Sequence, residues 1–206
     1  MAASIWPTIH AERQALASDL EALSEEQWET TSLCHAWTVR DTLAHMTATA
    51  RMTPPQFFAK MMGSGFNFSK MTMKEIASQK GVDPTATLST FRDAVNLSSH
   101  PPGPAMSWLG ETLVHSEDIR QPLGITHSYP TDAAVQVADF YKTSNLLIGA
   151  KKRITGVTLR ATDADWSTGN GPEISGPMIS LLMAMCGRKP ALEDLSGDGV
   201  ETLRSR

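Results

Sequence analysis

Apolar residues recur at helical spacing through the first 150 residues, as they do in amphipathic helices that pack around a common core. The clearest helix begins at Thr38, because Thr38 and Asp41 have the spacing of a capping box and an apolar stripe follows them. Pro54 and Pro55 predict a break after this helix. The Met- and Ser-rich stretch 63–81 is predicted to be a loop with one short helix. The other predicted helices span about residues 12–23, 84–97, 105–120 and 132–149.

The hydrophobic pattern changes in the last quarter of the chain. Partial alternation of apolar and polar residues predicts a strand over 154–161, and two more short strands or turns are predicted within 165–176. Pro177 is well placed as the first residue of a further helix. The predicted fold is therefore mainly α, with a helical domain at 1–150 and a small α+β domain at 151–206.

Composition excludes several classes of function. The formal net charge is −4, the pI is about 5.8, and no Lys/Arg-rich run occurs, so no nucleic-acid partner is expected. No apolar stretch has the length of a membrane span, and the N-terminal residues do not resemble a signal peptide, so no membrane partner is expected. Cys34 and Cys186 form no CxxC motif, which is typical of a reduced cytoplasmic location.

Three residues form a candidate metal site. Glu111 and His115 are four positions apart, which places both side chains on one face of a helix where they can reach one ion. His45, on an earlier helix, is the candidate for a third ligand, the usual number in a catalytic zinc site. Both histidines lie on a more polar face, away from the main apolar stripe of their helices. Periodicity leaves open whether these two faces are solvated or look into a shared cleft.

Two stretches, 37–45 (WTVRDTLAH) and 111–124 (ETLVHSEDIRQPLG), resemble the mycothiol-dependent maleylpyruvate isomerase family. This family belongs to the DinB-like superfamily of metal-binding four-helix bundles, and the tail of the chain is similar to its small C-terminal domain. The resemblance implies a DinB-like four-helix bundle with a small α+β C-terminal domain. It also implies that His45, Glu111 and His115 hold a divalent metal ion, usually zinc. One position departs from the family pattern, because Ala36 stands where the family often has glycine.

The resemblance also implies the chemistry. Two imidazoles and one carboxylate leave an open position on zinc, where a thiol is bound as the reactive thiolate. The family supplies that thiol as the cosubstrate mycothiol, and a small electrophile would be the other partner. Whether the reaction is cis–trans isomerisation or thiol transfer stays open, and a homodimer is a possible assembly. The alternative is a metal- or small-ligand-binding protein of this fold without turnover. Iron is less expected than zinc, because iron centres with these ligands usually sit on β-barrels.

Other residues are candidates for supporting roles. The resemblance implies that Arg188 faces the metal cleft and binds an anionic group of the substrate or thiol, as a catalytic and cofactor-binding residue. The alternative is a surface arginine at a helix C-terminus. Asp118 follows His115 by about one turn and is a candidate for orienting its imidazole. Adjacent residues such as Cys34 and His35 seldom form a nucleophile–base pair, and Cys186 is expected in the core.

Overall fold

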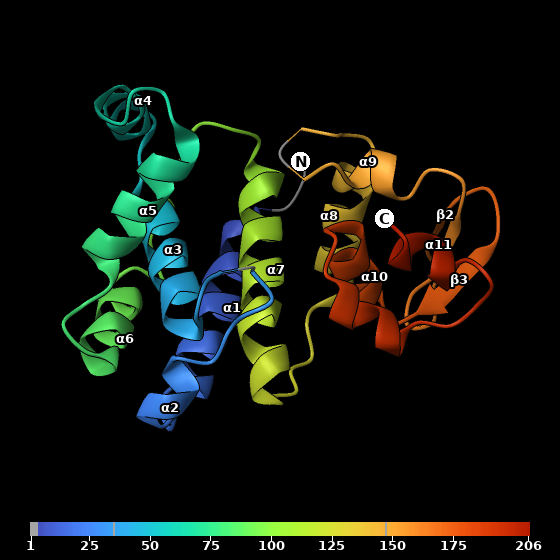
Figure 1. The fold of residues 1–206 in the computed structure, drawn as a ribbon, viewed down its shortest axis with the longest axis horizontal. Coiled ribbons are helices and arrows are strands. Elements are labelled where there is room, and N and C mark those ends of the chain that lie inside the picture. Colours follow the sequence, from blue (N-terminus) through green and yellow to red (C-terminus); the bar gives the residue numbers. More distant parts are fainter. Residues whose placement is uncertain (1–3, 35, 147) are drawn as a thin grey trace. The chain divides into compact units, whose positions relative to one another are not determined.

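The computed structural model describes residues 4–34, 36–146 and 148–206. The chain forms two compact units, Met1–His127 and Ser128–Arg206. The first unit is helical, and the second combines helices with a small sheet (Figure 1). Along the chain, the second unit begins at Ser128, earlier than the boundary expected at residue 150. The reason is that α8 (Thr131–Tyr141) packs against α10 (Met178–Met185) within the second unit.

Amphipathic helices pack around one core in the first unit. In order, they are α1 (Trp6–Asp19), α2 (Glu25–Trp28), α3 (Val39–Arg51), α4 (Pro54–Gly63), α5 (Phe68–Gln79), α6 (Pro84–Arg92) and α7 (Ala105–Leu123). Helix α3 packs against α5, α6 and α7, and α1 packs against α6 and α7. The buried apolar residues at the centre of this unit include Leu16, Leu20, Trp28, Leu43, Met46, Leu88, Phe91 and Ile119.

The segment that follows α3 differs from its prediction. Pro54 and Pro55 do end α3, but they also open α4, since the first turn of a helix needs no backbone N–H from proline. The stretch predicted as a loop with one short helix does contain one helix, α5, but at 12 residues it is longer than predicted. Burial of Met71 and Ile76 stabilises α5 as it packs on α3, a tertiary contribution that periodicity does not show.

The second unit is built around a three-stranded sheet. Strand β1 (Thr158–Ala161) lies in the middle, antiparallel to β2 (Ser167–Gly169) and parallel to β3 (Glu173–Gly176). The remaining elements are α8, α9 (Ala150–Arg153), α10, the 3₁₀ helix η1 (Lys189–Asp194) and α11 (Val200–Arg204). The predicted fold class, a mainly α protein with a small α+β C-terminal part, is confirmed. In the part of the chain that the structure describes, no helix has the length and apolar character needed to cross a membrane.

Candidate metal centre

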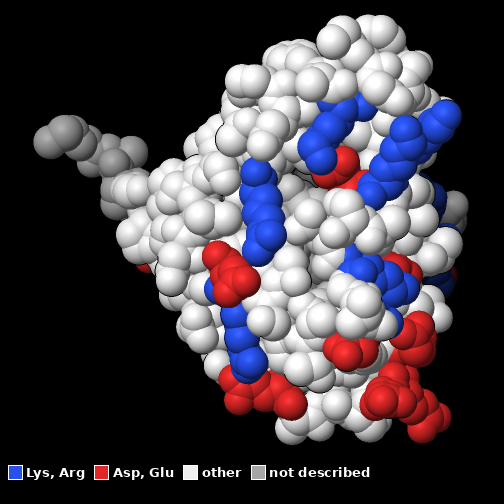
Figure 2. Space-filling view, turned by 90° about the vertical axis from the view of Figure 1, so that its left-hand side faces the viewer, with Lys and Arg blue, Asp and Glu red and all other residues white. Residues whose placement is uncertain are grey.

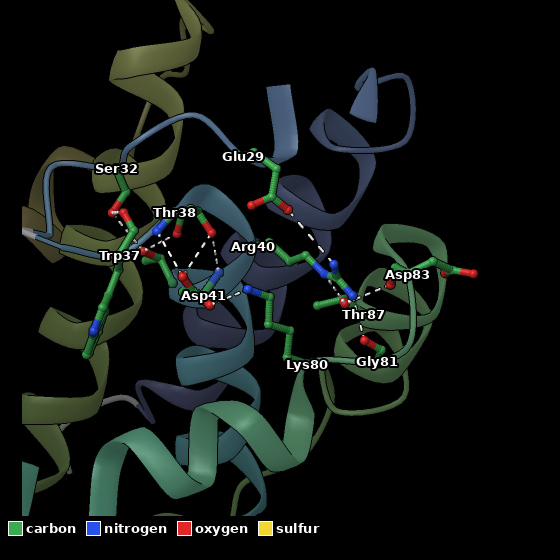
Figure 3. A network of polar contacts seen from close by, with 11 residues as sticks. Glu29, Ser32, Trp37, Thr38, Arg40, Asp41, Lys80, Gly81, Asp83 and Thr87 are labelled. Carbon is green, nitrogen blue, oxygen red and sulfur yellow. Dashed lines mark hydrogen bonds and ion pairs between the residues drawn. The ribbon is translucent and has the colours of Figure 1, made fainter. Parts of the chain in front are cut away.

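A polar network holds the N-terminal end of α3 (Figure 3). The capping box is present as predicted: the Asp41 N–H donates to Thr38 Oγ1 at 3.1 Å, and the Thr38 N–H donates to the Asp41 carboxylate at 3.2 Å. Lys80 Nζ donates to the other carboxylate oxygen at 2.7 Å. Arg40, the neighbouring residue, donates through Nε to a threonine hydroxyl of α6 at 3.0 Å. Because His45 lies about one turn after Asp41, these contacts fix its position.

His45, Glu111 and His115 come together within the first unit, and each of them is partly buried. One ligand atom from each lies within 4.8 Å of the others. The rings of His45 and His115 are perpendicular, with centroids 5.1 Å apart. On the same helix faces, Thr42 and Thr112 are fully buried. The polar faces of α3 and α7 therefore meet each other, which excludes the solvated alternative for both helices.

The Glu111 carboxylate has an unusual environment. Both of its oxygens are buried, and neither has a hydrogen-bond partner of acceptable geometry among the residues described. The nearby Thr112 hydroxyl donates instead to the Trp108 carbonyl, at 2.9 Å. Burial raises the pKa of Glu111, an effect that the positive charges of His115 and Arg13 and, to a smaller extent, the nearby hydroxyls of Thr49 and Thr112 partly offset. A buried carboxylate without hydrogen bonds is costly, and a divalent cation between it and two imidazoles would satisfy it. The donor set therefore fits a metal ion.

The two histidines have opposite electrostatic settings. His115 Nδ1 is 2.9 Å from a carboxylate oxygen of the fully buried Asp118. Burial lowers the pKa of His115, but its hydrogen bonds to Asp118 and Cys34 outweigh this effect and raise the pKa to about 10. Burial, with a smaller contribution from the charge of His115, lowers the pKa of His45 to about 3. His45 is thus neutral, as a metal ligand must be. Because Asp118 engages Nδ1 of His115, Nε2 is the nitrogen available to an ion.

Two neighbours of the site were not predicted from the sequence. Cys34 Sγ lies 3.9 Å from His115 Nδ1, and Cys34, His115 and Asp118 form a second group whose ligand atoms lie within 4.8 Å of one another. The Trp37 ring packs 4.9 Å from the His45 ring. From the sequence, Cys34 was a candidate only in a pair with His35, which lies outside the described residues. Cys34 and Trp37 lie just before the Thr38 cap of α3 in the sequence, and this closeness could have indicated that both residues lie near His45.

Arg188 lies in the second unit, whereas the three candidate ligands lie in the first. Its Nη1 donates to the Cys186 carbonyl at 3.1 Å. With Arg153, Lys189 and Arg206 it lines a cavity of about 90 Å³. Cys186 itself is buried at the C-terminal end of α10, as expected for a core residue. The cavity is surrounded by positive charge, but the proposed role of Arg188 at the metal cleft stays a prediction.

The fold and the His–Glu–His group together define the class of protein: a helical bundle with a candidate metal centre and a small α+β part. Residues 9–96, within the first unit, match the family model described as "Mycothiol maleylpyruvate isomerase N-terminal domain", the family that the sequence motifs resemble. The resemblance seen in the sequence is thereby confirmed.

Two solved structures share the fold across both units. A crystal structure of the mycothiol-dependent maleylpyruvate isomerase matches with a TM-score of 0.66 and 12% identity, covering 94% of this chain and 91% of that chain. A histidine-to-alanine mutant of that isomerase matches with a TM-score of 0.62 at the same identity and coverage. A comparison with curated proteins found no significant match. At this level of identity, the structural likeness shows the fold alone.

Proposed function

We propose that this protein is a metal-dependent enzyme that uses mycothiol to transform a small electrophile, either as a cis–trans isomerase or as a thiol transferase. His45, Glu111 and His115 hold the ion, and zinc is the metal we favour. The observation that carries the proposal is the Glu111 carboxylate, whose buried oxygens have no hydrogen-bond partner of acceptable geometry among the described residues, beside two imidazoles whose ligand atoms lie within 4.8 Å. A low-molecular-weight thiol as partner fits a reduced, cytoplasmic location.

The residues around the ligands have separate tasks. A bound zinc ion with an open position would stabilise the thiolate form of a thiol, which is the reactive nucleophile. Asp118 accepts the Nδ1 proton of His115 and so fixes the tautomer and the orientation of this ring. Trp37 packs against His45 and limits the rotation of its imidazole. The charge of Arg13, which is buried, offsets part of the cost of an ionised Glu111.

We further propose that Arg188 binds an anionic group of the substrate or of the thiol cosubstrate. A guanidinium recognises a carboxylate with two parallel hydrogen bonds. Support comes from its cavity, where Arg153, Lys189 and Arg206 add positive charge. Maleylpyruvate, named in the description of the matched isomerase, is an acid and would suit such a site.

The second candidate function is binding of a metal or small ligand without turnover, in a stress or regulatory role. The observation that favours it is the 12% identity to the solved isomerase. A shared fold with so few shared residues does not fix the chemistry of the site.

Metal analysis combined with a turnover assay tests both candidates. The purified protein should hold about one equivalent of zinc, and His115→Ala should lose it. His10→Ala is the matched control, because His10 lies on α1 outside the candidate site. Turnover of a panel of unsaturated and halogenated electrophiles should require mycothiol. Zinc retained in His115→Ala would contradict the ligand assignment. Zinc binding without thiol-dependent turnover would favour the second candidate.

A further inference from the structure

The hairpin formed by α4 and α5 exposes a group of large apolar side chains. Helix α4 buries none of its residues, and α5 buries only three. We call the exposed apolar residues of this segment the hairpin patch. It consists of Phe58 (59% exposed), Met62 (64%), Phe66 (73%), Phe68 (53%) and Met73 (53%). Soluble domains rarely gather so many large apolar side chains in one exposed segment unless the surface binds something.

In the turn between α4 and α5, the exposed ring of Phe66 stands on a strained backbone. Phe58 and Met62 are four residues apart and share a face of α4. Phe66 follows in the turn with a φ of +58°, in the left-handed region that bulky side chains avoid. Its N–H donates to the Met61 carbonyl at 2.9 Å, which holds this conformation. Because the Phe66 side chain is 73% exposed, packing within the first unit does not offset the strain.

Lysine side chains accompany the hairpin patch. Residues 54–74 contain Lys60, Lys70 and Lys74 but no Asp or Glu, although the whole chain has a net charge of −4. Lys60 pairs with Glu75, whereas Lys70 and Lys74 are exposed. Lys74 Nζ lies 3.3 Å from the carbonyl of Gly63, which places it beside the turn. Figure 2 shows this face: an uncharged lobe at the level of α4, with Lys and Arg side chains below it and acidic side chains among them.

We propose that the hairpin patch docks onto an anionic lipid bilayer. Phenylalanine side chains insert at the level of the headgroups, and flanking lysines bind lipid phosphates, which is how surface-bound amphipathic segments associate with membranes. No stretch of the chain is long enough to span a bilayer, so a membrane partner was not expected, but span length is not a criterion for surface binding. A second copy of this chain fits less well, because a symmetric contact would bring the lysines of both copies to one interface.

Cosedimentation of the full chain with vesicles tests the proposal. Binding should be clear on vesicles of mixed phosphatidylglycerol and phosphatidylcholine, weak on phosphatidylcholine alone, and should decrease with added salt. The double variant Phe58→Ser, Phe66→Ser should bind anionic vesicles at least about tenfold more weakly. Lys70→Gln and Lys74→Gln should each reduce binding about fivefold. Val82→Ser is the matched control, since Val82 is 95% exposed and lies outside the hairpin.

Each other outcome has a definite meaning. Wild-type protein that binds neither vesicle at low salt overturns the proposal. Equal binding to both kinds of vesicle would show that the lysines do not contribute and would contradict the proposed preference for anionic lipid. If sedimentation without lipid shows a dimer that Phe58→Ser, Phe66→Ser dissociates, the patch is a contact between copies of the chain. Zinc content is measured in the same samples, so a failure here is distinguishable from a failure of the proposed function.

Discussion

At the scale of single residues, Ala36 shows a conformation that its side chain disfavours. Its φ is +66°, and the Trp37 N–H donates to the Cys34 carbonyl at 3.0 Å to close a turn directly before α3. Ala36→Gly should therefore increase the free energy of unfolding by about 0.5–1 kcal/mol, because glycine adopts a positive φ without a steric penalty. Urea denaturation measures this change.

The same substitution elsewhere in the chain gives a control of opposite sign. Ala59 is an exposed residue inside α4, where glycine lowers the stability of a helix by about 0.5–1 kcal/mol. An Ala36→Gly variant as destabilised as Ala59→Gly would show that this turn does not need a left-handed residue. The family resemblance implies glycine at position 36, and the positive φ observed here is a physical reason for that preference.

The cysteines are predicted not to supply the nucleophile. Cys186 is buried in the second unit, and Cys34 contacts the His115 nitrogen that faces Asp118. The double variant Cys34→Ala, Cys186→Ala should keep zinc and thiol-dependent turnover within about a factor of ten, since the external thiol carries the reaction. Loss of turnover in a folded variant that still holds zinc would revive a mechanism based on a protein thiol.

Arg188 is predicted to act on binding, with no effect on folding or metal content. Arg188→Ala should weaken binding of an anionic substrate or cosubstrate about ten- to a hundredfold, the cost of about 1.5–3 kcal/mol for a lost charged hydrogen bond. Arg188→Lys should recover only part, because a point charge does not replace a bidentate guanidinium. Arg160→Ala is the control, since Arg160 pairs with Glu173 on the sheet of the same unit. Wild-type affinity in both Arg188 variants would leave Arg188 a surface residue at the end of α10.

At the scale of elements, the position of the first turn of α3 determines where His45 lies. The stability of this turn depends on pH, because Asp41 caps it as a carboxylate. Burial raises the pKa of Asp41, but the contacts with Lys80 and Thr38 outweigh it and hold the pKa below its ordinary value of 3.8. A carboxylate with a lower pKa in the folded state stabilises the protein above the ordinary pKa. That contribution is lost as the pH falls through the lower, folded-state value.

Asp41→Asn should lower the free energy of unfolding by about 1 kcal/mol at neutral pH, because the amide gives up the ion pair with Lys80 and part of the capping box. The difference between variant and wild type should shrink as the pH falls below about 4, the ordinary pKa of an aspartate, and should vanish below the lower folded-state pKa of Asp41. Urea unfolding at a series of pH values measures both effects. The control is Asp93→Asn, because the Asp93 side chain is 73% exposed. A difference independent of pH would mean that the charge of Asp41 contributes nothing.

At the scale of the whole molecule, metal binding should be linked to folding. A ligand that binds only the folded state stabilises it by about 2.7 kcal/mol when its free concentration is about a hundredfold above Kd. Zinc should therefore raise the Tm of the full chain, and a chelator should lower it. Calorimetry of wild type and His45→Ala measures this, with the variant expected to respond to neither. An equal zinc response in His45→Ala would remove this residue from the ligand set.

The two units also show which features of the fold a local sequence pattern can predict. The beginning of α3, the helical placement of Glu111 and His115, and the proline before α10 were predicted because caps and i,i+4 spacing depend on a few neighbouring residues. The length of α5 and the position of α8 in the second unit were not predicted. Both depend on burial against helices that are distant in sequence, which the pattern of neighbouring residues does not show.

For the candidate site, the sequence by itself determined which residue types were available: two imidazoles, one carboxylate and an aspartate one turn after His115. Only the tertiary structure decided that the polar faces of α3 and α7 meet in the interior, that the Glu111 oxygens are left without hydrogen-bond partners among the described residues, and that Cys34 reaches His115. The physical reason is that spacing sets the direction of a side chain along its own helix. What that side chain meets depends on how helices far apart in the chain pack, since burial is a property of the whole fold.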